Sequence, residues 1–87
     1  MKADHKKVKR LLNTARGQLD GILKMVDEDR YCIDVSNQLM ATIALLRKVN
    51  REVIAAHMMS CMSDAIAEGH GEEKIDELMK LLDKMEK

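Results

Sequence analysis

Two residues in the second half of the chain have types and spacing that suit metal binding. His57 and Cys61 are four positions apart in a chain that contains no proline. On an α-helix this spacing places both side chains on one face. An imidazole nitrogen and a thiolate can then bind one soft metal ion. The same pair would also suit a helix interface, with a polar histidine beside a small buried cysteine, so the spacing alone leaves both interpretations open.

The only other cysteine is Cys32. If one continuous helix joins Cys32 to His57, the 25 positions from one to the other span about 37 Å at 1.5 Å per residue. Cys32 therefore cannot reach His57 and Cys61 of its own chain. An antiparallel helix of a second copy would bring that copy's Cys32 beside them, so a three-ligand site requires a dimer with two equivalent sites. Cys32 would also lie near a helix N-terminus, where the helix dipole favours a thiolate.

The ligand types favour one metal ion. Two thiolates and one imidazole, with no fourth ligand nearby, match Cu(I) best, whereas Zn(II) would need a fourth ligand. Met58, Met59 and Met62 offer thioether sulfur, but on a helix we interpret them mainly as core-filling side chains. Two cysteines in a chain with no visible export signal favour a metal or redox site over a structural disulfide, which also predicts a cytoplasmic location.

Length and composition predict one small all-α domain that comprises residues 1–87. The chain has no Trp or Phe, one Tyr, and eight Met, so aliphatic side chains and Met must supply the core. A core of this size is only marginally stable alone, which predicts that the helices bury further surface against other chains. No apolar run approaches the roughly 20 residues that cross a membrane as a helix.

Apolar residues recur at steps of four and three, which predicts three helices. The first extends from about residue 4 to 27 and is followed by a polar connector at 27–30. A long second helix carries the seven-residue repeat of a bundle seam and ends at the glycines of 68–71. A short third helix follows. The apolar stripes are Val8, Leu12, Ala15, Leu19, Ile22 and Val26, then Val35, Leu39, Thr42, Leu46, Val49, Val53 and Ala56, then Ile75, Leu78, Leu82 and Met85.

The charges are segregated although the net charge is zero. Residues 1–16 carry six basic side chains and one acid, whereas residues 57–87 carry eight acids and four lysines. Arg47, Lys48 and Arg51 form a second basic cluster. This asymmetry indicates either a polyanion partner on one side of the molecule or a solvated helix face. A monomer would bind DNA weakly, and an oligomer that placed these clusters on one surface would bind it well.

Several short segments together resemble the copper-sensing repressors of the CsoR/RcnR family. These are Tyr31-Cys32-Ile33-Asp34-Val35, the His57–Cys61 pair, Gly69-His70-Gly71, and a segment at 16–22 that is similar to the family's first helix. The resemblance covers nearly the whole chain. It implies a three-helix protomer with a long central helix, an antiparallel four-helix-bundle dimer, and dimers that pair into a tetramer. It also implies a repressor that binds operator DNA when metal-free and leaves it when an inducer binds.

The resemblance assigns roles to particular residues. It implies that Cys32 of one protomer binds Cu(I) together with His57 and Cys61 of the other. Tyr31 and Glu77 match the residues that orient these ligands, a role that metal-binding imidazoles generally need. Charge and resemblance together predict the DNA contacts, which are Lys9, Arg10, Arg16, Arg47, Lys48 and Arg51. Thr14 departs from the pattern, because many members carry a basic residue there.

Other functions remain as alternatives. Nickel and cobalt sensors of the family use an additional N-terminal histidine, for which His5 is the candidate, and persulfide and formaldehyde sensors lack part of the Cys–His–Cys set. The complete set favours copper over nickel, cobalt, zinc or reactive sulfur. A cytosolic copper-buffering protein would have no use for the basic first helix, and a small redox enzyme would need a CxxC pair that the chain lacks. The prediction is therefore a binding protein and not an enzyme.

Overall fold

The first helix, α1, is His5–Asp27 in a computed structural model that describes residues 1–85. Asp4 caps its start, because the Asp4 carboxylate accepts hydrogen bonds from the backbone N–H groups of Lys6 (2.9 Å) and Lys7 (3.3 Å). After the helix ends, Asp29 adopts a left-handed conformation (φ 54°) that turns the chain toward the next helix. The polar connector thus forms the turn that its composition predicted, and Asp29 takes the place of a turn glycine.

The second helix, α2, is continuous over Cys32–Glu68, a length of 37 residues. It ends at Gly69, whose φ of 83° lies in the left-handed region that favours glycine. The backbone N–H of His70 donates to the carbonyl of Ala65 and that of Gly69 donates to Ile66. These two bonds form a Schellman motif. The motif reverses the chain into α3, which is Gly71–Met85.

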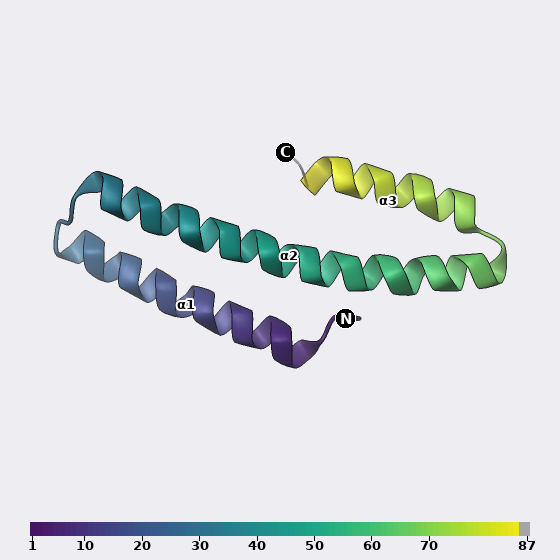
Figure 1. The fold of residues 1–87 in the computed structure, drawn as a ribbon, viewed down its shortest axis with the longest axis horizontal. Coiled ribbons are helices and arrows are strands. Elements are labelled where there is room, and N and C mark those ends of the chain that lie inside the picture. The colour runs from purple at the N-terminus through teal and green to yellow at the C-terminus, as the bar shows by residue number, and fades with distance from the viewer. Residues whose placement is uncertain (86–87) are drawn as a thin grey trace.

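The three helices lie side by side in a single layer (Figure 1). α1 runs back along the first part of α2, and α3 folds back along the last part on the other side of α2. The described chain measures 58 × 27 × 11 Å, so it is as thick as one helix. This confirms the predicted all-α class and the three helices with a long central one, since residues 1–85 contain no strand.

The small core lies between α1 and α2. Val8, Ala15 and Ile22 are buried on α1 against a face of α2 that includes Val49 and Thr42. The hydroxyl of Thr42 donates to the side-chain oxygen of Gln18 at 2.8 Å, so the one buried polar side chain described is satisfied.

The predicted apolar stripes divide between two sides of the helices. On α1, Leu12, Leu19 and Val26 are exposed, and the partly buried Leu11, Gln18 and Met25 face α2 instead. Leu39 and Leu46 of α2 are likewise exposed. The stripes of α1 and α2 are therefore only half buried within the single chain. One half of each of these two stripes packs between α1 and α2, and the other half is exposed on the layer.

Candidate functional site

An open cavity of about 280 Å³ lies between the last part of α2 and α3. His57 and Cys61 of α2 and Glu77 of α3 line it, together with Leu78 and Leu81. His57 and Cys61 are one helical turn apart and share this cavity, as their spacing predicted. Cys61 is a free, partly buried thiol and His57 is exposed. These two donors can bind one soft metal ion, but they leave it without a third ligand.

Cys32 lies at the opposite end of α2. It is the first residue of that helix and an exposed free thiol. Because α2 is unbroken, the rise along it from Cys32 to His57 is about 37 Å. Within residues 1–85, no three His, Cys, Asp or Glu side chains lie close enough together to hold a metal ion. The structure thus confirms that one chain brings together only two of the three predicted ligands.

The two residues expected to orient the ligands occupy different ends of the molecule. Glu77 lies beside the His57–Cys61 pair. Tyr31 immediately precedes α2, its side chain makes no capping hydrogen bond, and it is 62% exposed. Tyr31 therefore accompanies Cys32, and only Glu77 is positioned to act on His57 of the same chain.

Lys74 is a residue of this site that the sequence reasoning missed. Its ammonium donates a hydrogen bond to the Oε2 atom of Glu77 at 3.0 Å. This carboxylate, and the nearby Cys61, raise the pKa of Lys74 above its ordinary value. The three-residue separation between Lys74 and Glu77 on a predicted helix was the signal that could have revealed the pair.

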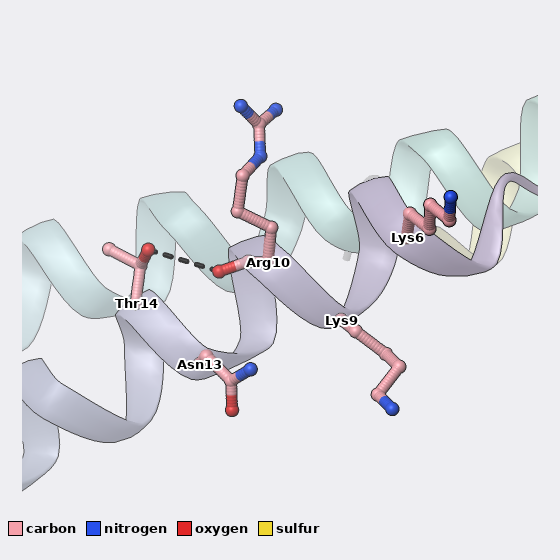
Figure 2. A pocket seen from close by; sticks show the side chains of 5 residues that line it. All are labelled: Lys6, Lys9, Arg10, Asn13 and Thr14. Atoms are coloured by element: carbon pink, nitrogen blue, oxygen red, sulfur yellow. Dashed lines mark hydrogen bonds between the residues drawn. The ribbon is translucent and has the colours of Figure 1, made fainter.

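The predicted basic residues of α1 lie on its outer surface. Lys9 and Arg10 line a shallow hollow with Lys6, Asn13 and Thr14, and their side chains extend away from the helix in opposite directions (Figure 2). The Thr14 hydroxyl donates to the backbone carbonyl of Arg10 at 3.1 Å, so it is engaged within the helix. Arg16 is also exposed. Lys6 and Asn13 belong to this surface although they were not among the predicted contacts.

The second basic cluster lies in the middle of α2. Arg47, Lys48 and Arg51 are all exposed. Arg47 and Arg51 line a hollow with Leu82 and Met85 at the end of α3. The two clusters therefore belong to different helices and line different hollows, so a joint surface requires further chains or a partner that follows both helices.

None of the helices within residues 1–85 combines the length and the apolar character that crossing a membrane would require.

The sequence is similar to known metal-responsive repressors. A family model described as "Metal-sensitive transcriptional repressor" matches residues 4–84. The copper-sensing transcriptional repressor CsoR of Mycobacterium ulcerans is 46% identical over 68 residues, which are 78% of this chain and 58% of that protein. The protein of the same name from Bacillus subtilis is 38% identical over 76 residues, 87% of this chain and 75% of that protein. This chain thus spans less than two thirds of the mycobacterial relative.

Solved structures give the same result. The structure of the copper-sensing repressor CsoR with Cu(I) from Geobacillus thermodenitrificans matches with a TM-score of 0.80 and 36% identity, covering 94% of this chain and 85% of that chain. The nickel-responsive transcriptional regulator InrS matches with a TM-score of 0.83 and 32% identity, covering 98% and 96%. Because the family model matches residues 4–84 of the 87 in this chain, the chain belongs to the family of metal-sensitive transcriptional repressors.

Proposed function

We propose that this protein is a copper-responsive transcriptional repressor that binds operator DNA when metal-free and is released when Cu(I) binds. The ligands would be Cys32 of one copy with His57 and Cys61 of another. The observation that carries the proposal is an incomplete site, in which His57 and Cys61 share one cavity while an unbroken α2 holds Cys32 at its far end. A soft ion of low coordination number, such as Cu(I), matches two thiolates and one imidazole.

The exposed apolar residues support an oligomer. The layer is 11 Å thick, and Leu39, Ile43 and Leu46 are exposed along α2. Such a surface is unstable in water unless another chain covers it. We infer that α1 and α2 of two copies form an antiparallel four-helix bundle, and that two dimers pair into a tetramer. The antiparallel arrangement would bring Cys32 and Tyr31 of one copy to the His57–Cys61 pair of the other.

The residues around His57 suggest how metal binding would reach α3. One ring nitrogen of His57 would bind the ion, and the other would remain as an N–H donor. Glu77 lines the same cavity and is the carboxylate available to accept that hydrogen bond. A bond from His57 on α2 to Glu77 on α3 would connect the two helices only when the metal fixes the ring orientation. The change would then favour the state that does not bind DNA.

Nickel is the main alternative inducer, because the structurally similar InrS is nickel-responsive. The N-terminus does approach the relevant part of α2, since Ala3 belongs to the core cluster that Ala56 packs against. The donor set of two thiolates and one imidazole, with Cys32 supplied by a second copy, favours copper. A sensor of reactive sulfur would use Cys32 and Cys61 and would not need His57.

The basic surfaces support a DNA partner over a copper-buffering role. Lys9, Arg10 and Arg16 on α1, with Arg47, Lys48 and Arg51 on α2, are exposed and can neutralise phosphates. A copper buffer would gain nothing from them. We place this function in the cytoplasm, where thiols stay reduced, and we assign the protein a binding role without catalysis.

A gel-shift assay on the DNA upstream of the protein's own gene tests the proposal. The metal-free protein should retard this DNA, and anaerobic Cu(I) should release it, whereas Ni(II) or a persulfide donor should not. The Cys61→Ser variant should bind the DNA and ignore Cu(I). Release by Ni(II) alone would favour the nickel alternative, and release by persulfide that survives His57→Ala would favour the sulfur alternative. No retardation at low salt would remove the repressor function.

A further inference from the structure

Lys74 is unusual among the basic residues of this chain. Within residues 1–85, only Lys7 and Lys74 are partly buried, and the other lysines and arginines are exposed. Lys7 pairs with Glu52 and so connects α1 to α2. Lys74 pairs with Glu77 on its own helix, with side chains that are 35% and 68% exposed. Because α2 is the one helix that α3 contacts within residues 1–85, the partial burial indicates that Lys74 lies toward α2.

Cys61 lines two cavities, and Lys74 lines the second of them. The first contains His57, Cys61 and Glu77. The second, of about 250 Å³, contains Cys61, Lys74 and the acids Asp64, Glu68 and Glu73. The ion pair between Lys74 and Glu77 therefore joins a residue of one cavity to a residue of the other, and the two cavities share Cys61.

Among the residues that the structure describes, Lys74 forms its ion pair with Glu77 and not with an acid of its own cavity. Three acids line the same cavity as Lys74, yet its ion pair within residues 1–85 is with Glu77. Glu77 is also the carboxylate beside His57. The acceptor that a metal-bound His57 would need is thus already engaged by a lysine in the metal-free chain.

We propose that Lys74 is a positioning residue, which holds Glu77 in the metal-free protein, and that Glu77 changes partner from Lys74 to the His57 ring N–H upon metal binding. This inference rests on the proposed function. One change favours the exchange, because a metal-bound imidazole presents its other N–H as a fixed donor.

The exchange has a thermodynamic consequence. An ion pair that forms only in the metal-free state stabilises that state relative to the metal-bound one. Lys74 therefore raises the concentration of metal that is needed for release from DNA. Removing it should make the protein more sensitive, by roughly two- to fivefold, the range expected for one partly exposed ion pair.

The test compares Lys74→Met with Lys24→Met in the full chain. Lys24 is an exposed lysine of α1 whose ion pair with Glu28 is local, and it lines neither of the two cavities. Half-release of DNA should need about two- to fivefold less Cu(I) for Lys74→Met and an unchanged amount for Lys24→Met and Lys74→Arg. Glu77→Gln should need more Cu(I). The double variant Lys74→Met/Glu77→Gln should match Glu77→Gln alone, because Lys74 acts through Glu77.

NMR of the Glu77 side-chain carboxyl carbon gives a second readout without DNA. In the metal-free protein, Lys74→Met should shift this resonance and Lys24→Met should not, and Cu(I) should shift it in the wild type. Equal Cu(I) requirements for Lys74→Met and Lys24→Met, or additive effects in the double variant, would overturn the role of Lys74 while wild-type release by Cu(I) still supported the proposed function. If Cu(I) fails to release the wild type, the proposed function is wrong. A Glu77 resonance that Cu(I) leaves unchanged would overturn the exchange as well.

Discussion

The two sides of α2, one toward α1 and one toward α3, are packed very differently. On the first side, α1 and α2 share a core in which Val8, Ala15 and Ile22 are buried, and the Lys7–Glu52 ion pair adds a polar link between the helices. The second side meets α3, which has no buried residue. Within residues 1–85, no side-chain hydrogen bond or ion pair joins α3 to α2, because the pairs that involve α3 are local ones.

This difference in packing separates the rigid α1–α2 core from the α2–α3 contact, which can shift more easily. Few buried contacts and exposed side chains are the features of segments that open or shift at low free-energy cost. His57, Cys61 and Glu77 line a cavity on the weakly packed α3 side of α2, whereas Lys9 and Arg10 lie on the firmly packed α1. A coupling free energy of about 1–3 kcal/mol, typical of allosteric proteins, is enough to reposition α3 but not to disrupt the α1–α2 core.

The largest expected effect is on stability. Ile22→Ala removes a buried side chain from the α1–α2 core and should lower the free energy of unfolding by about 2–5 kcal/mol. Leu78→Ala in α3 truncates a side chain that is only partly buried, so its loss should be about 1 kcal/mol or less. Chemical denaturation at one fixed protein concentration measures both. Equal losses would mean that α3 is as firmly packed as α1 in the assembled protein.

The next effect concerns the response to metal. Glu77→Ala should leave the Cu(I) affinity within about tenfold of the wild type, the low end of losses from residues that orient ligands. It should, however, remove most of the ~1–3 kcal/mol by which Cu(I) weakens DNA binding, because His57 loses its acceptor on α3. Asp76→Ala, at an exposed acid of the same helix, is the matched control.

DNA titrations with and without saturating Cu(I) measure this coupling. A ratio of DNA affinities that is unchanged in Glu77→Ala would mean that Glu77 is one more solvated acid of α3 and that the signal takes another route.

A smaller effect tests whether the outer surface of the firmly packed α1 binds DNA. Lys9→Ala and Arg10→Ala should each lower the slope of log affinity against log salt by about one unit. Lys80→Ala on α3 should leave the slope unchanged. At a fourfold change in salt, one unit corresponds to about a fourfold change in affinity. Binding that does not depend on salt, or equal effects of Lys9 and Lys80, would contradict a phosphate-binding role for α1.

Local signals in the sequence were sufficient to predict the helices. The predicted first helix, about residues 4 to 27, differs by one residue from His5–Asp27, because Asp4 supplies a cap and the connector is polar. Gly69 marked the end of α2. The facing residues were not predictable from apolar side chains alone. Gln18 faces α2 because its amide pairs with Thr42, and Leu19 beside it is exposed.

The site was predictable only in part, for a similar reason. The spacing of His57 and Cys61 specified a shared face because both lie on one helix. The role proposed for Cys32 requires a second copy, because α2 holds it far from His57 and Cys61 of its own chain. Lys74 was missed because its importance comes from the packing of α3 against α2, which brings it near Cys61. A spacing rule finds the Lys74–Glu77 pair but does not indicate what lies beside it.

The most direct test of the central claim is the Cu(I) affinity of a purified heterodimer of Cys32→Ala and Cys61→Ala. Each variant alone should lose tight Cu(I) binding, because two donors cannot complete the site. The heterodimer, isolated with two different affinity tags, should contain one intact site and one that lacks both thiols. We expect tight binding of one Cu(I) per heterodimer, measured anaerobically against a competing chelator. If tight binding is absent from the heterodimer, or is retained by either variant alone, the ligands do not come from two copies and the account is wrong.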